Sequence, residues 1–520
     1  MSSMQLKNFS CQIAVIGSGL PGSIMALILA KLGFDVVVID KATHPRFAIG
    51  ESSTPMADAY LVRIASDFGI PELLPLSTYS GTRKAYPDLD VGIKRGFSYF
   101  WHEQNRKFEF EKQHSNELVV AASPNDEVAD SNWMRSDVDH KIVQWFNNYG
   151  VQFLDNCQIH SISHSTPGFR FSLEKDSREF TLGADYFVDA SGGSAVGVRA
   201  MGGRSRLREM WTDTSALFAH FEGLQRWNEF VPQQLRNDYP YRCDDAAVHQ
   251  LIQNGWMWQL RFQSGVTSCG IVQRNNADSL FTLLSKLGEK ATGPESLRVF
   301  HQITKSYPSL GEQFANAHVV SPKPGVFFRQ RLQHWYDGGA GQNWCALPNT
   351  IGFVDPLHSK GIAHALSGVY RLGHLFRNEG MDPGQNLNQK VEKLADDFQL
   401  EIQFLDRLIA LCYLSLESFD LFRLATLWYF AAATNFERCV CGQAGFNQSF
   451  LLSDDDEFRK ALFDFADQLK LSMDETSKKT RSMDSLARKY LDSYDLIGLF
   501  DPPIPNMYGN TSAPRDVKTV

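Results

Sequence analysis

Short apolar runs at the start of the chain give a strand, helix and strand pattern. Residues 12–16 (QIAVI) predict a buried parallel strand, because the apolar run is stopped by glycine. A helix is expected from about Pro21 to Leu32, ended by Gly33. Residues 36–39 (VVVI) predict a second buried strand. The first forty residues therefore predict a βαβ unit.

Segments after residue 40 predict a loop, further strands and a helix, and then the sheet of a second lobe. Residues 43–54 read as a loop, and the alternation in residues 92–101 (GIKRGFSYFW) predicts one strand. A helix is expected from Arg135 to about Phe146, and residues 186–188 predict another buried strand. Mixed polar and aromatic strands between about 200 and 320 indicate the sheet of a substrate lobe.

The last third of the chain is predicted to be helical. From about Asn386, apolar side chains recur at helical spacing. This pattern runs through Leu405, Ile409, Cys412, Leu416, Phe419 and Phe422. The Pro-rich tail after Asp501 predicts an irregular and loosely held end.

Composition narrows the class of protein. With 520 residues, 43% apolar and 21% charged, the chain is expected to form a globular protein of two lobes. A net charge of −8 argues against nucleic acid as a partner, and no apolar run is long enough to span a bilayer. The eight cysteines lack metal-ligand spacing, so no metal site is expected. Without a signal-peptide pattern, the cytoplasm is the expected compartment.

A glycine-rich motif lies between the first predicted strand and helix. Residues 17–22 (GSGLPG) allow a tight turn at Gly17, approach of backbone to a pyrophosphate at Gly19, and close helix packing at Gly22. Asp40 ends the second strand, where a carboxylate accepts hydrogen bonds from ribose. This arrangement predicts dinucleotide binding.

Two later motifs favour FAD over a nicotinamide cofactor. Residues 189–193 (DASGG) resemble the second glycine turn of glutathione-reductase-type flavoproteins. Residues 352–356 (GFVDP) and Arg135 resemble FAD-contacting positions of aromatic hydroxylases. The expected fold is α/β, a Rossmann-like FAD-binding domain with an inserted mixed-sheet substrate lobe and a helical C-terminal region. The expected boundaries are 10–200 for the first FAD-binding part with substrate-lobe strands near 80–130, 201–325 for the substrate-lobe sheet, 326–380 for the returning FAD-binding part and 381–520 for the helices.

Four segments together resemble flavin-dependent halogenases, and most closely the phenol-directed branch that includes phloroglucinol halogenases. They are residues 44–55 (HPRFAIGESSTP), 92–101, 255–260 (GWMWQL) and 351–362 (IGFVDPLHSKGI). The resemblance implies FADH2 from a separate flavin reductase, O2, chloride or bromide, and a small electron-rich aromatic substrate. It selects Lys94 as the catalytic lysine over its cationic neighbours Lys84 and Arg95.

The same resemblance assigns further site residues. Trp256 and Trp258 would lie on the flavin and substrate side, although Leu260-Arg261 replaces the Ile-Pro that follows them in the family. Ser359, Lys360 and Gly361 would bind halide through backbone amides, and His358 would accept a released proton. The expected cofactor-binding residues are Gly17, Ser18, Gly19, Gly22, Asp40, Arg46, Gly50, Glu51, Ser52, Arg135, Asp189, Gly352, Asp355, Gly361 and Ile362.

Two other functions fit many of these features. An aromatic-ring monooxygenase would share nearly every FAD signal, and a flavin-binding protein without turnover would retain the lysine and the halide turn as relics. The sequence leaves open the substrate, free or tethered to a carrier protein, the halide preference and the oligomeric state, with a homodimer as one option.

Overall fold

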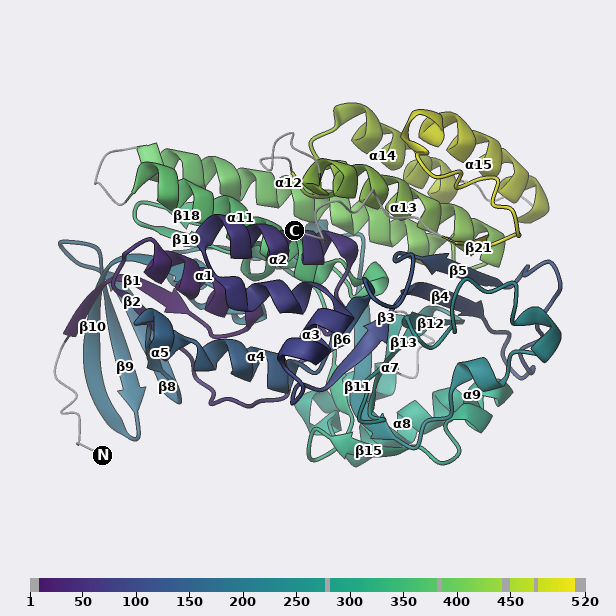
Figure 1. Cartoon of the computed structure of the whole chain (residues 1–520), viewed down its shortest axis with the longest axis horizontal. Helices are drawn as coiled ribbons and strands as arrows, with labels where there is room; N and C mark the ends of the chain where they lie inside the picture. The colour runs from purple at the N-terminus through teal and green to yellow at the C-terminus, as the bar shows by residue number, and fades with distance from the viewer. Residues whose placement is uncertain (1–8, 276–280, 381–385, 442–448, 472–475, 510–520) are drawn as a thin grey trace.

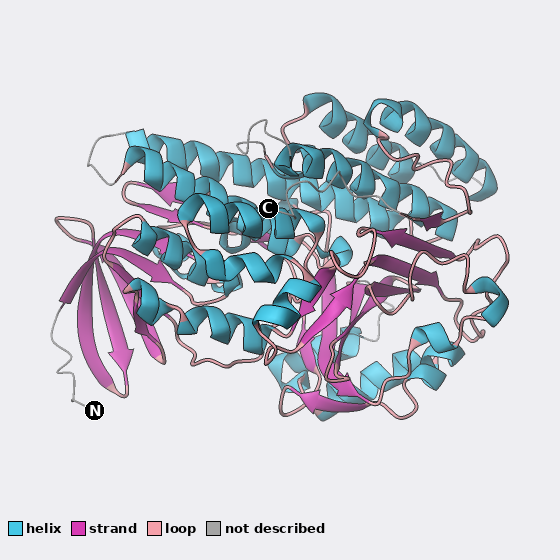
Figure 2. Ribbon diagram, viewed as in Figure 1, coloured by secondary structure: helices cyan, strands magenta, loops and turns pink. Residues whose placement is uncertain are grey.

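The computed structural model describes residues 9–275, 281–380, 386–441, 449–471 and 476–509. Two sheets lie side by side, and the C-terminal helices run along one side of both (Figures 1 and 2). The α/β fold expected from the sequence, with a βαβ unit, a second sheet and a helical C-terminal region, is confirmed. Among the described residues, no helix has the length and apolarity needed to cross a bilayer.

The first sheet contains the predicted βαβ unit. Its order is β18-β19-β10-β1-β2-β7, and β8 and β9 extend it in antiparallel fashion from β10. The strands from β19 to β7 are parallel, so their carboxyl ends meet at one edge. The strands are β1 (Phe9–Ile16), β2 (Val36–Ile39), β7 (Gln152–Leu154), β8 (Cys157–His164), β9 (Phe169–Lys175), β10 (Arg178–Asp189), β18 (Ala340–Gly341) and β19 (Trp344–Ala346).

Helices cover this sheet because their apolar residues need a partner layer. The first helix, α1 (Leu20–Lys31), is buried along nearly its whole length and contacts α4, α5 and α11. Its hydrophobic residues are continuous, as expected of a helix enclosed on all sides. The other helices of this half are α2 (Pro55–Phe68), α3 (Tyr79–Ala85), α4 (Arg135–Gln144), α5 (Phe146–Tyr149), α6 (Val196–Ala200), α10 (Pro348–Ile351) and α11 (Gly361–Glu379).

The second sheet has the order β15-β11-β14-β13-β12-β4-β5-β21, with β16 beside β11. Its central strands are buried on both faces: Phe97 and Tyr99 pack toward the C-terminal helices, whereas Phe100 packs against Trp227 on the other face. Helices α7 (Phe281–Leu287), α8 (Pro294–Lys305) and α9 (Pro308–Gln313) belong to this half. The strands are β4 (Gly96–Trp101), β5 (Glu117–Ala121), β11 (Thr214–Glu222), β12 (Ala247–Ile252), β13 (Gly255–Arg261), β14 (Thr267–Arg274), β15 (His318–Ser321), β16 (Phe327–Arg329) and β21 (Met507–Tyr508).

The single strand predicted for residues 92–101 is wrong. The chain forms β3 (Val91–Lys94) and β4, interrupted at Arg95, and the two strands belong to different sheets. β3 pairs with β6 (Asp130–Trp133), while a second small sheet joins β17 (His334–Trp335) to β20 (Gly352–Phe353). Alternation of side chains could not reveal the break, because Lys94 and its apolar neighbours are all enclosed.

The C-terminal helices correct two further expectations. The continuous helical pattern divides into α12 (Asn386–Leu414) and α13 (Phe419–Cys441), with Leu416 in the turn between them. Helices α14 (Asp456–Leu471) and α15 (Thr476–Leu491) follow. The tail is not loose throughout, since β21 pairs with β5 and its Met507 and Tyr508 are buried. Residues 510–520 lie outside the described part of the chain.

Candidate active site

The turn between β1 and α1 packs closely against neighbouring backbone at Gly17 and Gly22 but is open at Gly19. Gly17 has a φ of +101°, and a Cβ there would lie 2.6 Å from the carbonyl oxygen of Ala190. A Cβ on Gly22 would lie 2.2 Å from the carbonyl oxygen of Gly17. At Gly19, the nearest atom to such a Cβ is Nη2 of Arg46, at 3.8 Å. The turn thus leaves space beside a guanidinium and a helix N-terminus, which fits a pyrophosphate.

Asp40, at the end of β2, organises this turn. Its carboxylate accepts hydrogen bonds from the amide (2.8 Å) and the hydroxyl (2.7 Å) of Ser18, and from the amide of Ala42 (2.9 Å). Arg46 lies 3.3 Å from the same carboxylate. Burial opposes ionisation, but Arg46 and the Ser18 amide lower the pKa of Asp40 below its ordinary value. Asp40 is therefore a charged group at the glycine turn.

Arg135, at the start of α4, anchors the loop that follows β2. Its guanidinium makes a bidentate ion pair with Asp139, with both distances 2.8 Å. It also donates to the carbonyl oxygens of Gly50 (2.8 Å) and Ile49 (3.3 Å). Four of its donors thus already have protein acceptors, and Arg135 sets the position of the loop that carries Gly50.

The next residues of this loop bind the second sheet. Glu51 is 1% exposed, and its carboxylate contacts Nε2 of His220 and accepts from the hydroxyl of Ser268, both at 2.7 Å. Ser52 forms an isolated β-bridge with Asn132. The loop after β2 therefore joins the first sheet to the wall of the second.

Asp189 and Gly352 shape the other turns of the first sheet. The Asp189 carboxylate is fully buried and accepts from the amides of Gly197 (2.6 Å), Val198 (2.9 Å) and Ser191 (3.0 Å). Burial raises the pKa of Asp189, and these amides oppose the increase. A Cβ on Gly352 would lie 2.6 Å from Cδ1 of Ile402. Both residues hold backbone close together at the edge where a cofactor is expected.

Asp355 lies in a buried polar network that the sequence did not reveal. Its carboxylate accepts from the hydroxyls of Thr214 (3.1 Å) and Tyr413 (3.0 Å) and from the amide of Leu357 (3.0 Å). Gln333 in turn donates to the hydroxyl of Thr214 and to the carbonyl oxygen of Val354, both at 2.7 Å. The turn around Asp355 is thereby tied to the second sheet and to α12.

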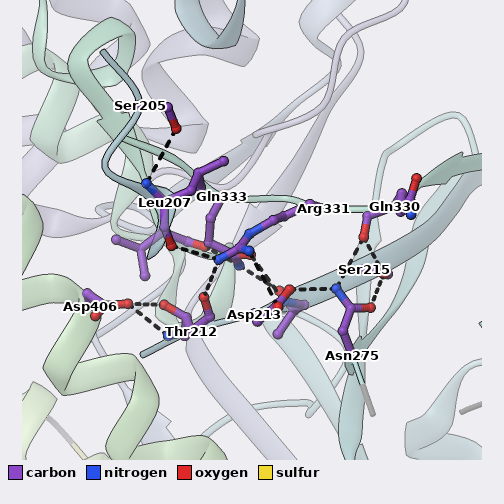
Figure 3. Close-up of polar contacts among 12 residues, drawn as sticks. Ser205, Leu207, Thr212, Asp213, Ser215, Asn275, Gln330, Arg331, Gln333 and Asp406 are labelled. Carbon is purple, nitrogen blue, oxygen red and sulfur yellow. Dashed lines mark hydrogen bonds and ion pairs between the residues drawn. The ribbon is translucent and has the colours of Figure 1, made fainter. Parts of the chain in front are cut away.

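Arg331 continues this network at the edge of the second sheet (Figure 3). It donates to the carbonyl oxygens of Leu207 (3.2 Å) and Thr212 (3.3 Å), and pairs with Asp213 (3.4 Å). Asp406 of α12 accepts from the hydroxyl and the amide of Thr212. These contacts fix the start of β11, which carries Thr214 toward Asp355.

The two tryptophans of β13 are each linked by hydrogen bonds to a buried carboxylate, Trp256 to Asp355 and Trp258 to Glu51. Trp256 donates to the hydroxyl of Tyr413 (2.9 Å), which donates to Asp355. Trp258 donates to Ser268 (3.1 Å), which donates to Glu51. Hydrogen-bonded indoles keep fixed ring orientations in a core.

The Leu260-Arg261 departure extends β13. Arg261 pairs with Thr267 of β14, a position where proline would have no amide to donate. Its Nη2 donates to the carbonyl oxygen of Leu224 (2.8 Å). A Cβ on Gly92 would lie 1.7 Å from the carbonyl oxygen of Arg261, so only glycine allows β3 to approach this closely. This approach positions the strand that ends at Lys94.

Lys94 is fully buried. Its Nζ donates to the carbonyl oxygen of Ser53 (2.5 Å) and lies 4.1 Å from the centre of the Phe97 ring. Lys84 is exposed on α3, and Arg95 pairs with Asp126. Of these three cations, only Lys94 is enclosed without solvent contact.

A small cavity lies against Phe97, the ring that Lys94 contacts, and its lining does not include Lys94 itself. It has a volume of about 10 Å³, roughly the space of one water molecule, so an aromatic ring needs the wall side chains to move. Thr54, next to the carbonyl that binds Lys94, lies in its wall together with the ring of Phe97. The remaining wall residues are Pro55, Ala122, Tyr429, Phe430, Ala433, Thr434 and Glu437. Helix α13 thus supplies most of one side.

The turn before α11 is made by two non-glycine residues with positive φ, His358 (+66°) and Ser359 (+55°). Ser359 donates its amide to the carbonyl oxygen of Pro356 (3.1 Å), so this amide already has an acceptor. Gly361 and Ile362 begin α11, where amides have no acceptor within the helix. The first turn of α11 therefore offers the amide donors that a halide needs.

The His358 ring lies behind the cavity wall. Its Nδ1 contacts the hydroxyl of Tyr99 (2.8 Å), its Nε2 contacts Sγ of Cys412 (3.4 Å), and its ring stacks on Tyr429 with centres 4.5 Å apart. Burial, with the nearby His249 and Lys360, lowers the pKa of His358 well below its ordinary value. In this geometry His358 has both ring nitrogens directed at protein atoms.

Known proteins share this fold and sequence. Structures of the halogenase PltM resemble the chain, and the complex of PltM with phloroglucinol and FAD has a TM-score of 0.79 and 21% identity, covering 94% of this chain and 98% of that one. The fold is thus that of the flavoprotein halogenases. The tryptophan halogenase family matches residues 135–413, more than half of the sequence, and the chain belongs to this family of flavin-dependent halogenases.

Curated relatives agree with this assignment. Monodechloroaminopyrrolnitrin halogenase PrnC of Pseudomonas fluorescens is 26% identical over 84% of this chain and 74% of the relative. Tetracycline 7-halogenase of Kitasatospora aureofaciens is 26% identical over 68% of this chain, and the match spans 60% of that relative's length. The prediction of a flavin-dependent halogenase is confirmed at the level of family and enzyme class.

Sequence reasoning missed the residues that complete the site from distant segments. Tyr413, Tyr429 and Glu437 were part of a helical pattern that indicated only packing. Thr214 lies in the region predicted as the substrate-lobe sheet, and Gln333 lies in the part predicted to return to the FAD-binding domain; neither was singled out. A polar residue on the buried side of a helix, such as Glu437, is the one signal that the pattern itself contained.

Proposed function

We propose that this chain halogenates a small phenolic compound, using FADH2 from a separate flavin reductase, O2, and chloride or bromide. The observation that carries the proposal is the buried Lys94, whose ammonium contacts the ring of Phe97 on the wall of an aromatic-lined cavity. A lysine ammonium can hold an electrophilic halogen by hydrogen bonding at a fixed place next to a ring. The eight free thiols support a reducing compartment such as the cytoplasm.

The residues of the glycine turn fit FAD. Gly17 and Gly22 make the turn, Gly19 leaves room for phosphate beside Arg46, and Asp40 supplies a carboxylate for ribose. When bound, the reduced flavin would supply two of the electrons that reduce O2, and the halide, oxidised to hypohalous acid, would supply the other two. Ser18, Gly50, Glu51, Ser52, Arg135, Asp189, Gly352, Asp355, Gly361 and Ile362 complete the proposed flavin site.

The halide would bind at the first turn of α11, through the amides near Lys360 and Gly361. Trp256 and Trp258, held through Tyr413 and Ser268, would wall the passage between flavin and substrate and keep water out. Lys94 would then receive hypohalous acid and present its halogen to the substrate ring.

A product assay tests this function. The chain would be incubated with FAD, a flavin reductase, NADH, O2 and each halide, with phenols and indoles offered free and as carrier-protein thioesters. Mass spectrometry should show halogenated phenol that depends on added halide. Hydroxylated product without halide dependence would favour the monooxygenase, and the absence of any product would favour a flavin-binding protein without turnover.

FAD binding has a sharper test in Gly19→Val. Because the nearest atom to a Cβ at Gly19 is 3.8 Å away, the variant should fold normally in the absence of ligand. The branched side chain should nevertheless occupy the place of the pyrophosphate and abolish flavin retention. Gly183→Val, on strand β10 with its nearest neighbour at 3.7 Å, is the matched control and should retain FAD. Full FAD retention by Gly19→Val would contradict the proposed site.

A further inference from the structure

One of the residues that line the cavity next to Phe97 is acidic, and the mechanism above does not use it. Glu437 lies on α13 and is 5% exposed, and its side chain shares the cavity wall with Phe97, Tyr429 and Phe430. The remaining wall residues are mostly small or short (Thr54, Ala122, Ala433 and Thr434). The wall therefore combines aromatic rings, which suit a planar substrate, with one acidic group.

The hydroxyl groups of this wall form hydrogen bonds with backbone atoms. The hydroxyl of Tyr429 donates to the carbonyl oxygen of His358 (3.0 Å), and that of Thr434 donates to the carbonyl oxygen of Phe430 (2.8 Å). Thr54 caps α2 by accepting from the amide of Ala57 (3.4 Å). Glu437 is the one carboxylate among the residues that line this cavity, and a carboxylate is a side chain that can accept a proton.

Electrostatics agree with this placement. Burial raises the pKa of Tyr429, and the nearby carboxylates of Glu437 and Asp130 raise it further. Asp130 faces Lys94 in the pairing of β3 with β6. The charge of Glu437 is therefore felt at the same ring that closes the cavity next to the Lys94 strand.

We propose that Glu437 binds the hydroxyl group of a phenolic substrate and removes its proton, while Lys94 holds the electrophilic halogen. This proposal rests on the proposed halogenase function and deepens it. In this proposal the proton acceptor is Glu437 of α13 and not His358, because both ring nitrogens of His358 already contact Tyr99 and Cys412.

The proposed step is balanced with hypohalous acid as the oxidant. The phenol O–H bond breaks and its proton passes to the Glu437 carboxylate, which makes the ring more electron-rich. A ring carbon forms the carbon–halogen bond while the halogen–oxygen bond breaks, so that carbon is oxidised and the halogen is reduced. The oxygen leaves as hydroxide and takes the ring proton to form water. Glu437 then returns its proton to the product.

The test compares Glu437→Gln with the original chain on a series of fluorinated phenols that keep a free ring position. Glutamine preserves size and hydrogen bonding but cannot accept the proton. On phenol itself, product formation should fall about 100-fold, in the range of general-base effects. As the substrate becomes acidic enough to enter as phenolate, the ratio of variant to original rate should approach one.

Two variants and one substrate make the test specific. Glu437→Asp keeps a carboxylate and should recover part of the lost rate, while Glu457→Gln, exposed on α14, is the matched control. The methyl ether of phenol has no proton to give, so its slow halogenation should be equal in Glu437→Gln and the original chain. FAD retention and thermal unfolding would show that each variant is folded.

The outcomes separate this proposal from the proposed function. If the original chain gives no halide-dependent product, the halogenase proposal fails and this one with it. If the original chain halogenates phenol but Glu437→Gln slows every phenol by the same factor, Glu437 only shapes the pocket and the base role is overturned. Equal loss on the methyl ether would overturn it as well.

Discussion

Two buried lysines lie in two of the four segments that resemble flavin-dependent halogenases, residues 92–101 and 351–362, and their surroundings differ. Lys360 directs its Nζ to the carbonyl oxygens of Asp355 (2.6 Å) and Leu357 (3.1 Å), both in its own turn. Lys94 instead contacts the carbonyl oxygen of Ser53, in the loop before α2, and the ring of Phe97 on β4. One lysine closes a local turn, and the other joins elements around a cavity.

This difference teaches what burial does to a lysine. Burial lowers the pKa of Lys360 to about 8, although the Asp355 carboxylate opposes the shift, and its hydrogen bonds hold the turn before α11. Its amine is a structural group enclosed by its own backbone. Lys94 is also buried, but it contacts Phe97, one of the residues that line a small cavity. Position relative to a cavity, rather than burial, distinguishes the lysine expected to react.

The largest expected effect is that of Lys94→Ala. Loss of the ammonium should remove the halogen from its place beside the substrate and lower product formation by about 1000-fold, within the range for lost orientation. Oxygen consumption should continue, because Lys94 is not part of the glycine turn. Product mass and oxygen uptake on the same sample measure both effects. Lys94→Arg should also fail, because a guanidinium differs in shape and donor geometry.

The control for this experiment is Lys84→Ala, which removes an exposed lysine of α3 and should leave both rates unchanged. Lys360→Met should retain most of the halogen transfer, measured as halogenated product formed per O2 consumed, once halide is bound. If Lys94→Ala retained the original product yield, or if Lys360→Met alone uncoupled oxygen uptake from product, the comparison between the two lysines would be reversed.

The glycine turn could be predicted from the sequence, whereas the cavity wall could not. Gly17, Gly19, Gly22 and Asp40 lie within twenty-four residues, and their strand-turn-helix context is local, so sequence spacing already placed them together. The close contact of Gly17 with Ala190 follows from parallel pairing of β1 with β10. Such features are predictable because each depends on a neighbouring element.

The cavity wall depends on contacts between segments far apart in the sequence. Thr54, Phe97, Ala122 and Glu437 come together only after α13 packs beside α2 and the second sheet. The sequence indicated helices from residue 386 but could not say which helix face would line the cavity. The break of residues 92–101 at Arg95 was hidden for a similar reason, since both strands are enclosed by later elements.

An intermediate effect is expected in the pH dependence of stability. The pKa of Lys360 is about 8 in the folded chain, below 10.5 in the unfolded chain, so the unfolded state binds more protons between these values. The free energy of unfolding should therefore gain about 2 to 3 kcal/mol from Lys360 as pH rises from 7 to 10. Denaturant titrations of the original chain and Lys360→Met should differ by this gain. Identical pH dependence in the two proteins would mean that burial does not depress this pKa.

The smallest effect concerns His249, whose pKa is sensitive to Lys94. Burial, with a smaller contribution from the Lys94 charge, lowers the pKa of His249 to about 3. Its ring stacks on Tyr99, with centres 4.4 Å apart, and lies 5.1 Å from the ring of Trp256. A neutral, stacked imidazole thus lies close enough to Lys94 to respond to its charge.

The buried neutral His249 makes the folded chain less stable as pH falls, not as pH rises. Below pH 6.5 the unfolded chain protonates this histidine while the folded chain keeps it neutral, so stability is lost as pH falls toward 3. Between pH 7 and pH 5 the loss from this one residue should be about 2 kcal/mol. His249→Phe keeps a stacked ring and should remove that part of the acid sensitivity, whereas His318→Phe, at an exposed position, should not. Denaturant titrations at both pH values measure the difference, and an unchanged acid loss in His249→Phe would show that this imidazole is protonated within the folded chain.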